Sequence, residues 1–289
     1  VEVLAEMESL GIKLDLKLFN SLSKELEKKL DKLTKDIYEM SGSEFNINSP
    51  KQLRVVLFDQ LKLPVIKKTK TGPSTDEDVL KKLADKHKLP ALLLEYRLLT
   101  KLKTTYIDVL PELADRSTGR IHTSFNQKGT ETGRLSSSNP NLQNIPIKAG
   151  IGAEIRKAII AGEKENYLIS CDYSQIDLRI LAHLSQDEYL VHAFKKGMDI
   201  HKATAALIYG VKESEVSGEM RDRAKRVNFG IVYGLTSYGL SRDLGIALDE
   251  AHSFIDAYFS RSPGVKEYFD KQIRLCHKEG FVTTILGRR

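Results

Sequence analysis

Two groups of side chains in this sequence could carry out chemistry together. The first centres on Asp172, which directly follows an apolar run over 167–171 that predicts a β-strand. A carboxylate at the end of a strand is a rigidly aimed oxygen ligand for a hard cation such as Mg²⁺. An aspartate in this position can equally cap the helix that the sequence predicts over 176–184, and taken alone capping is the more frequent role.

The second group consists of Arg221, Lys225, Phe229 and Tyr233, spaced four residues apart. On a helix each such step turns about 40° past a full turn, so the four side chains form one gently spiralling stripe. Two cations beside two rings suit a nucleoside triphosphate, with the cations on its phosphates and the rings at its base. A basic helix that packs its aromatic residues into a core has the same spacing. His201 could reach the same phosphates, although a lone histidine is more often a surface or capping residue.

The composition bounds the function classes. The chain has 289 residues, a length typical of about two domains. It contains 45 Lys and Arg residues and 39 Asp and Glu residues, which give a formal net charge of +6. This balance permits a polyanionic partner such as nucleic acid, and a mildly basic solvated surface has it too. The chain has 41% hydrophobic and 29% charged residues. This composition excludes collagen-like, disulfide-scaffold and wholly disordered proteins.

Two cysteines, Cys171 and Cys276, are too few for a disulfide framework and favour a reducing, intracellular setting. No apolar run approaches the roughly 20 residues that a transmembrane helix needs, so we expect no membrane partner.

The first half of the chain predicts a pair of long helices. Apolar residues at steps of three and four predict one helix over 19–41, which Gly42 ends. Ser49 followed by proline predicts the start of a helix over 51–61, and a second long helix is predicted over 91–110. Helices of this length form a projecting arm.

A polar, lysine-rich loop over 67–75 forms the tip of this arm. Lys70 in this loop and Lys103 on the second long helix could contact a phosphate backbone through charge. An exposed charged loop without a ligand is the more frequent explanation of such a composition.

From Gly119 the pattern changes to strands and turns. Residues 120–125 alternate as a strand does, and the long loop over 132–146 is rich in Gly, Ser, Asn and Pro. That loop carries too many hydrogen-bonding side chains for a mere spacer. The last hundred residues are predicted to be largely helical.

These segments resemble the motifs of one enzyme family. Residues 172–179, Asp-Tyr-Ser-Gln-Ile-Asp-Leu-Arg, resemble motif A of the family A DNA polymerases, and 221–234 resemble their motif B, the O helix of the fingers. Residues 132–146 resemble the family's template–primer contact segment, and 45–53 resemble part of its thumb. The motifs follow the family order and cover essentially the whole chain.

The resemblance implies an α+β fold with a right-hand polymerase architecture: a helical thumb, a partial antiparallel-sheet palm and helical fingers. The implied division is a helix leading into the palm over 1–14, the thumb over 15–110, the palm with motif A over 111–190, and the fingers with the O helix over 191–289.

The resemblance also implies metal ligands and catalytic residues. The carboxylate of Asp172 and the backbone carbonyl of Tyr173 would bind metal. Lys225 would donate a proton to the leaving pyrophosphate, so Asp172 and Lys225 are the candidate catalytic residues. The implied cofactor is Mg²⁺ in a two-metal site. The second aspartate of that site belongs to a His-Asp-Glu motif that does not occur before Arg289.

The implied nucleotide contacts come from both motifs. The two cations of motif B would hold the triphosphate, the two rings would lie near the incoming base and the nascent pair, and His201 would reach the β- or γ-phosphate. The candidate nucleotide-binding residues are Arg221, Lys225, Phe229, Tyr233, His201, Gln175 and Asp177.

The implied DNA contacts lie mainly in the polar loop. Arg134 would read the primer terminus from the minor groove, and Gln143 and Asn144 would lie along the duplex. Together with the two lysines of the arm, the candidate DNA-binding residues are Arg134, Asn141, Gln143, Asn144, Lys70 and Lys103.

Three departures from the family pattern matter. Asp177 stands where the family usually has glutamate, a residue thought to crowd the sugar 2′ position, so we expect weaker exclusion of ribonucleotides. Lys148 stands where arginine is common, which weakens a bidentate phosphate contact there. The chain ends at Arg289 before the His-Asp-Glu motif and does not begin with Met, so we expect a fragment of a larger polymerase, and we expect this fragment to contain no nuclease domain.

The activity implied is template-directed DNA synthesis, in which deoxynucleoside monophosphates from dNTPs are added to a primer 3′-hydroxyl and pyrophosphate is released. The implied partners are primer-template DNA and a dNTP, and we expect a cytoplasmic, nucleoid-associated monomer. Two alternatives stay open. One is a catalytically incompetent, DNA- and nucleotide-binding module, and the other is a single-subunit RNA polymerase, whose motif B is related.

Overall fold

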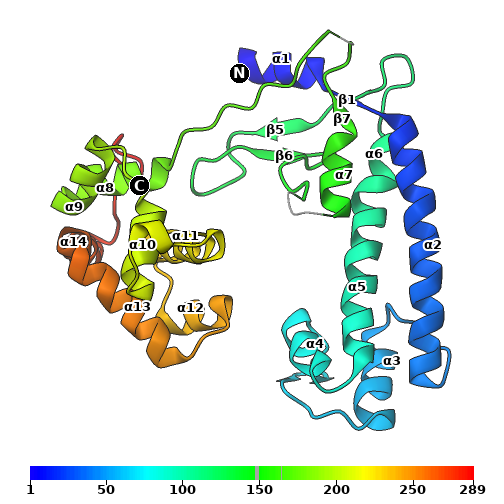
Figure 1. Cartoon of the computed structure of the whole chain (residues 1–289). Helices are drawn as coiled ribbons and strands as arrows, with labels where there is room; N and C mark the ends of the chain where they lie inside the picture. The colour runs from blue at the N-terminus through cyan, green and yellow to red at the C-terminus, as the bar shows by residue number, and fades with distance from the viewer. Residues whose placement is uncertain (147–149, 164) are drawn as a thin grey trace. The chain divides into compact units, whose positions relative to one another are not determined.

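The computed structural model describes the chain except for residues 147–149 and 164, so Lys148 lies outside the described residues. The chain folds into two compact units, Val1–Ile169 (unit 1) and Ser170–Arg289 (unit 2), and each is described by itself (Figure 1). The four-part division expected from the sequence is finer than this and stays a prediction.

Unit 1 combines a helical arm with small antiparallel sheets (Figure 1). Its helical segments are α1 (Glu2–Leu10), α2 (Leu16–Ser41), α3 (Pro50–Arg54), the π-helical turn η1 (Val55–Gln60), α4 (Glu77–Ala84), α5 (Lys88–Leu102), the π-helical turn η2 (Lys103–Ile107), α6 (Val109–Glu112) and α7 (Ile151–Lys157). Its strands are β1 (Ile12–Leu14), β2 (Lys68–Thr69), β3 (Gly72–Pro73), β4 (Arg120–Ile121), β5 (Ser124–Asn126), β6 (Ser136–Ser138) and β7 (Ile159–Ile160).

The arm is built on α2 and α5, which pack along each other (Figure 1). Asp15 caps α2 by accepting a hydrogen bond from the backbone N–H of Leu18 (3.0 Å). Gly42 ends the helix in the left-handed conformation, with φ 71°. The inner face of α2 buries Phe19 completely, and burial of such a side chain stabilises the fold by about 1.5–3 kcal/mol. The first predicted long helix is therefore confirmed, with its start at Leu16.

The far end of the arm has its own small core. Ser49 accepts a hydrogen bond from the backbone N–H of Gln52 (3.4 Å), and Pro50 opens α3 as the sequence predicts. The helix then continues through η1, and α4 packs against α5. Strands β2 and β3 form a hairpin inside the lysine-rich loop. The periodicity did not single out α4, which is short and highly charged.

In the main sheet, β1 lies between β4 and β7 and is antiparallel to both. Strands β5 and β6 form a separate pair. The strand predicted over 120–125 is broken between β4 and β5. At the break Thr123 is buried, and its Oγ1 donates to the carbonyl of Pro140 (2.7 Å) and pairs with the hydroxyl of Ser137 (2.6 Å), which holds the polar loop to the sheet.

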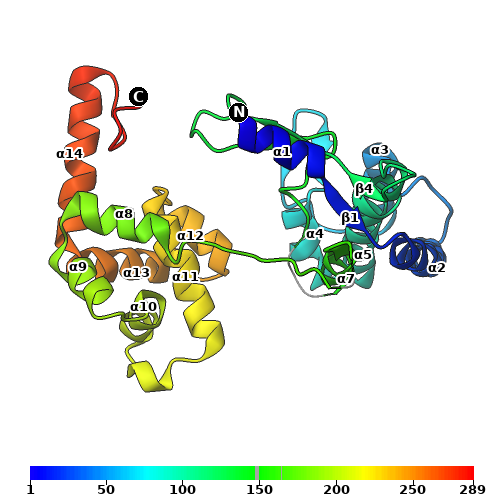
Figure 2. The same ribbon diagram turned by 90° about the horizontal axis from the view of Figure 1, so that it is seen from above.

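Unit 2, all of whose residues the structure describes, contains helices but no strand (Figure 2). Helix α11 packs on α10 and contacts α8 and α12, and α14 contacts α8 and α13. The helices are α8 (Ile176–Ser185), α9 (Glu188–Lys195), α10 (Ile200–Tyr209), the 3₁₀ turn η3 (Glu213–Glu215), α11 (Gly218–Val232), α12 (Ser237–Leu244), α13 (Leu248–Arg261) and α14 (Pro263–Glu279).

The strand predicted over 167–171 is wrong. The segment has no regular secondary structure, and Tyr167 and Ile169 are 88% and 86% exposed. A strand is stabilised by its hydrogen-bonded neighbours. Among the described residues no strand pairs with this segment, so its apolar composition alone does not make it a strand.

Within the described part of the chain, no helix is both long enough and apolar enough to span a membrane.

Candidate functional site

The predicted stripe lies on α11 and its C-terminal cap. Ser217 caps the helix by accepting a hydrogen bond from the backbone N–H of Met220 (3.2 Å). Small and branched side chains on one face pack into unit 2, which leaves Lys225 exposed on the other face. Tyr233 ends the helix and is 64% exposed, and Gly234 then turns the chain with φ 73°. The sequence therefore correctly placed the cations and rings on a single helix.

A hollow of about 370 Å³ lies beside α11. Three of the four stripe residues line it, so a cation and two rings share one concave surface. Arg221 does not line it. The lining residues are Lys225, Arg226, Phe229, Gly230, Tyr233, Leu235 and Asp243.

Arg221 instead forms an ion pair with Asp199 at the start of α10. Its Nε lies 2.7 Å from Oδ2 of Asp199, while Oδ1 of the same carboxylate accepts from the backbone N–H of Lys202 (3.1 Å) and caps α10. Partial burial raises the pKa of Asp199, but the hydrogen bonds from Arg221 and Lys202 outweigh it, so this pKa lies below its usual value. The guanidinium therefore already pairs with an anionic group of its own chain.

His201 is 2% exposed and packs between α10 and α11. Its Nδ1 lies 2.9 Å from Nδ2 of Asn228, and its ring centroid is 5.6 Å from that of Phe229. Burial lowers the pKa of His201, and the nearby charges of Arg221 and Lys225 lower it further, so the neutral ring is favoured. The predicted phosphate contact of His201 is not tested by this geometry, which shows instead a ring held by α11.

Asp177 and Tyr233 connect motif A to the end of α11. The Tyr233 hydroxyl donates to Oδ2 of Asp177 at 2.7 Å. A second hollow, of about 220 Å³, opens beside this pair and is otherwise apolar. Its lining residues are Asp177, Ile180, Leu181, Leu184, Val232, Tyr233, Tyr268 and Phe269.

Asp172 and Tyr173 are both exposed, ahead of α8. The helix begins after Gln175, which has φ 53° and whose side chain makes no capping hydrogen bond, so Asp172 is not the helix cap. Oε1 of Gln175 is buried without a hydrogen-bond partner among the described residues. Arg179 donates to the carbonyl of Ser174 (2.9 Å) and steadies this turn. The carboxylate of Asp172 is thus available to a ligand.

The predicted DNA-binding residues lie in unit 1, and four of them are exposed in the polar loop. The loop is ordered by its own polar groups: Asn141 Oδ1 accepts from the backbone N–H of Gln143 (2.9 Å), whose side chain donates to the carbonyl of Leu135 (3.0 Å). The hydroxyl of Tyr106 donates to the carbonyl of Asn144 (2.6 Å) and ties the loop to the arm. The four exposed residues are Arg134, Asn141, Gln143 and Asn144.

The two lysines of the arm differ. Lys70 is exposed at the β2–β3 hairpin. Lys103 is not free: its side chain is 18% exposed, and its Nζ lies 2.9 Å from both carboxylate oxygens of Asp108 and donates to the hydroxyl of Ser23 (3.1 Å). The ammonium group thereby links α2 to η2. The DNA contact of Lys103 stays a prediction.

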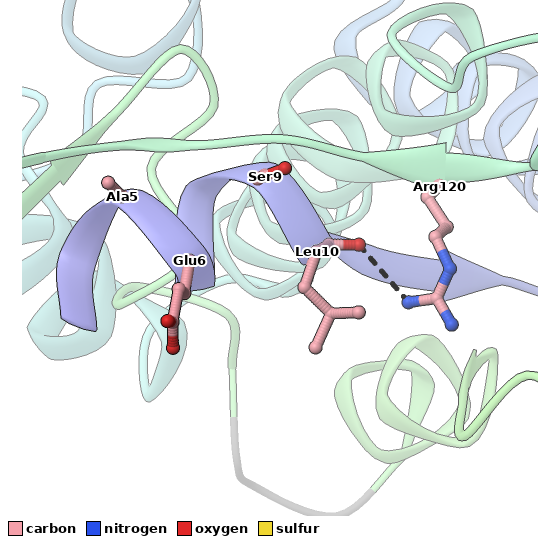
Figure 3. A pocket seen from close by; sticks show the side chains of 5 residues that line it. All are labelled: Ala5, Glu6, Ser9, Leu10 and Arg120. Atoms are coloured by element: carbon pink, nitrogen blue, oxygen red, sulfur yellow. Dashed lines mark hydrogen bonds between the residues drawn. The ribbon is translucent and has the colours of Figure 1, made fainter. Parts of the chain in front are cut away.

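One hollow in unit 1, of about 700 Å³, lies beside α1 (Figure 3). Arg120 at its edge donates to the carbonyls of Leu10 and Gly11, both at 3.3 Å, and Figure 3 shows the first of these bonds. None of the residues predicted for function lines this hollow, so its size does not make it the candidate site. Its lining residues are Ala5, Glu6, Ser9, Leu10 and Arg120.

Comparison with known proteins decides the family. The model of DNA polymerase family A matches residues 16–289. The chain belongs to DNA polymerase family A. The resemblance read from the motifs is confirmed.

Relatives of this family A chain include bacterial DNA polymerases I. It is 53% identical over 289 residues to the enzyme of Caldicellulosiruptor bescii, and 50% identical over 287 residues to that of Geobacillus stearothermophilus. The thermostable DNA polymerase I of Thermus aquaticus is 47% identical over 289 residues. These alignments cover 99–100% of the chain and 33–35% of the relatives. The chain thus spans about a third of the length of the relatives it matches.

A solved structure of similar fold is the POL domain of Pol1 from M. smegmatis in complex with DNA primer-template and dNTP. It matches with a TM-score of 0.92 and 44% identity, covering 99% of this chain and 50% of that one. The predicted α+β fold class of family A is confirmed by this likeness.

Two oxygen donors of this family A chain are candidate ligands for a metal ion. Among the described residues, no group of three or more His, Cys, Asp and Glu side chains is placed to hold a metal ion. Mg²⁺ is commonly bound by only one or two carboxylates together with substrate phosphates and water. The exposed carboxylate of Asp172 and the adjacent carbonyl of Tyr173 are hard oxygen donors, so they fit a magnesium ion that a triphosphate also binds.

Sequence reasoning missed the polar residues that hold α10 against α11. Asp199 has a detectable signal, since aspartate just before an amphipathic run is a typical N-cap. Asn228 also has a detectable signal, because it is a polar residue on the buried face of α11, which it shares with Ala224, Val227 and Ile231. Neither residue belongs to the spaced stripe, so neither was singled out.

Proposed function

We propose that this chain acts in template-directed DNA synthesis, in which a primer 3′-oxygen attacks the α-phosphorus of a dNTP. A new phosphodiester bond forms, the bond to the bridging α–β oxygen breaks, and pyrophosphate leaves. The observation that carries the proposal is the arrangement of α11. It presents Lys225, Phe229 and Tyr233 on one concave surface, and the hydrogen bond of Tyr233 joins that surface to motif A.

The cations of α11 bind and orient the triphosphate. Lys225 and Arg221 supply ammonium and guanidinium donors for charge-assisted hydrogen bonds to phosphate oxygens, and Lys225 gives a proton to the departing pyrophosphate. Nε of Arg221 is already paired with Asp199, so this carboxylate competes with a phosphate for the guanidinium. Phe229 and Tyr233 stack near the incoming base and the nascent pair.

Asp172 and the carbonyl of Tyr173 hold Mg²⁺. When bound there, the ion would favour loss of the 3′-hydroxyl proton and neutralise charge on the reacting phosphate. Gln175 and Asp177, which follow in the same turn, lie at the sugar side of the nucleotide, and His201 supports the phosphate side.

DNA binding is proposed for the polar loop of unit 1 and the hairpin of the arm. Arg134, Asn141, Gln143 and Asn144 are exposed polar side chains on an ordered loop, and Lys70 adds an exposed charge. The likeness to a polymerase domain solved with primer-template and dNTP supports these partners. We further propose that the protein is a monomer that works at the bacterial nucleoid, in keeping with its bacterial relatives.

Primer extension on a defined template tests the proposal. We expect the 289-residue chain, or the longer polymerase that contains it, to extend the primer only with the templated deoxynucleotide, and Lys225→Ala to reduce extension by at least about 100-fold. Arg223→Ala is the matched control, because Arg223 is a cation of the same helix that pairs with Glu219 (2.9 Å).

Binding of DNA and dNTP without any extension would support the incompetent binding module instead. A preference for ribonucleotides over deoxynucleotides would support the RNA polymerase alternative. Loss of extension in the Arg223→Ala control as large as that in Lys225→Ala would contradict the role given to Lys225.

A further inference from the structure

Three buried polar side chains lie between α10 and α11, beside apolar residues of the core of unit 2. Thr204 and His201 belong to α10, and Asn228 belongs to α11. They are 4%, 2% and 0% exposed. Buried polar groups are stabilising only when they are hydrogen-bonded, so the partners of each atom determine what these residues do.

The hydrogen bonds form a chain with a fixed direction. The Thr204 hydroxyl donates to Oδ1 of Asn228 (3.1 Å), which identifies that side of the amide as the acceptor. The other side of the amide, Nδ2, lies 2.9 Å from Nδ1 of His201. With the amide in this orientation its nitrogen donates, so Nδ1 of the imidazole accepts and carries no proton. In the neutral ring, the proton then lies on Nε2.

We propose that Thr204 and Asn228 are positioning residues, which hold His201 as the neutral tautomer with its proton on Nε2 and fix the rotation of α11 about its axis. This inference rests on the proposed function. An N–H group can donate to a phosphate oxygen, whereas the other tautomer would carry a lone pair on Nε2 and could not donate from that atom.

The charges around the ring favour the same state. The charges near the ring are the carboxylate of Asp199 and the cations of Arg221 and Lys225. Two nearby cations outnumber the one carboxylate, and the ring is buried. Both effects disfavour protonation of His201, which would add a third positive charge. The ring of Phe229 lies 5.6 Å away and covers it from the same helix. The ring is therefore a neutral donor among charged neighbours.

The amide also sets the rotation of α11. Successive residues on a helix are 100° apart, so a slip by one residue would carry Asn228 off both partners and onto apolar side chains. The same rotation would move the stripe of Lys225 and Phe229 away from its hollow. A polar residue at this buried position thus specifies one angular setting of the helix that carries the nucleotide contacts.

Nitrogen-15 NMR of the histidine side chains tests the tautomer directly. For the 289-residue chain at neutral pH, we expect the signal of His201 Nδ1 in the unprotonated range and that of Nε2 in the protonated range. Asn228→Asp replaces the donor by an acceptor, so the proton should move to Nδ1 or the ring should become doubly protonated. A wild-type ring protonated on Nδ1 would overturn the proposal.

A second experiment measures the binding of a Mg²⁺–dNTP to Thr204→Val. Thr204→Ser, which restores a hydroxyl, is the control. We expect Kd to rise by about threefold to tenfold in the valine variant, as for one lost hydrogen bond, and to return to the wild-type value in the serine variant. An unchanged Kd and an unchanged tautomer in Thr204→Val would overturn the proposal. Failure of the unaltered chain to bind any dNTP would contradict the proposed function instead. The NMR experiment would still determine the tautomer of His201.

Discussion

The hydroxyl of Tyr233 donates a 2.7 Å hydrogen bond to the carboxylate of Asp177. Tyr233 ends α11 and Asp177 lies in the first turn of α8, so this bond joins the two segments that resemble motifs A and B. Asp177 is one methylene shorter than the glutamate usual in the family, yet it still reaches the tyrosine. Under the proposed function, the shorter side chain leaves more space beside the nucleotide sugar.

This space predicts the sugar selectivity of the chain. We expect Asp177→Glu to disfavour ribonucleotides further, because the longer carboxylate fills room at the 2′ position while it keeps an acceptor for Tyr233. The ratio of Kd values for a ribonucleoside and a deoxynucleoside triphosphate measures this effect, and it should rise by about threefold to tenfold. Asp177→Asn, which keeps the length, serves as the control. A ratio that falls in Asp177→Glu would contradict the assignment.

The ion pair of Arg221 with Asp199 predicts a gain of affinity on mutation. In Asp199→Asn, the side chain can still cap α10 but no longer holds the guanidinium by charge. A triphosphate then meets Arg221 without having to displace a carboxylate, so we expect dNTP binding to tighten by about twofold to fivefold, the scale of one partly exposed ion pair. Isothermal titration measures the change. Weaker binding in Asp199→Asn would show that the pair orients Arg221 rather than competing with the phosphate.

The buried ring of His201 predicts a pH dependence of stability. Its pKa in the folded chain lies below the ordinary value of about 6.5, so the unfolded chain binds the proton more readily. The stability that the neutral ring contributes is therefore present above about pH 6.5, and it is lost progressively as the pH falls below that value. Urea unfolding of wild type and His201→Gln between pH 5 and pH 8 checks this. An equal loss in both chains would assign the effect to other groups.

The lysines of the arm should behave differently. Lys70→Ala should weaken binding to duplex DNA and lower the salt dependence by about one counterion, because an exposed charge is removed. Lys103→Ala should instead lower stability, because Asp108 and Ser23 lose their shared partner. Fluorescence anisotropy at several salt concentrations and thermal melting separate the two effects. Equal effects of both variants on DNA binding would contradict this distinction.

The core of the arm predicts a conventional loss of stability. Leu26 on α2 is fully buried, so Leu26→Ala should lower the free energy of unfolding by about 2–5 kcal/mol. Leu98 on α5 is 57% exposed, and Leu98→Ala should change it by less than about 0.5 kcal/mol. Denaturant unfolding of both variants measures the difference. Similar losses of unfolding free energy in Leu26→Ala and Leu98→Ala would contradict the described packing of α2 against α5.

Sequence patterns predicted the helices whose formation depends on residues close together in the chain. The long helix α2 follows from its apolar spacing and Gly42, and α3 follows from Ser49 and Pro50. The run over 167–171 was misread, because strand formation depends on a neighbouring strand that composition does not report. The stripe on α11 could likewise be found from spacing alone.

The site was only partly visible in the sequence, because much of it depends on contacts between helices. Nothing local reveals that Asp199 pairs with Arg221 or that Asn228 meets His201, since these partners are 22 and 27 residues apart. Lys103 is a further case. Its charge suggested a DNA contact, and the fold pairs its ammonium group with Asp108, 2.9 Å away.

Titration of the chain with a dNTP in the presence and absence of Mg²⁺ tests the central claim most directly. That claim is that Asp172 and the cations of α11 hold one magnesium-bound triphosphate. Binding should require Mg²⁺ and should weaken at least about tenfold in Asp172→Asn and in Lys225→Ala, while the control Arg223→Ala binds as wild type does. Binding that is independent of Mg²⁺ and equal in all four proteins would contradict the claim.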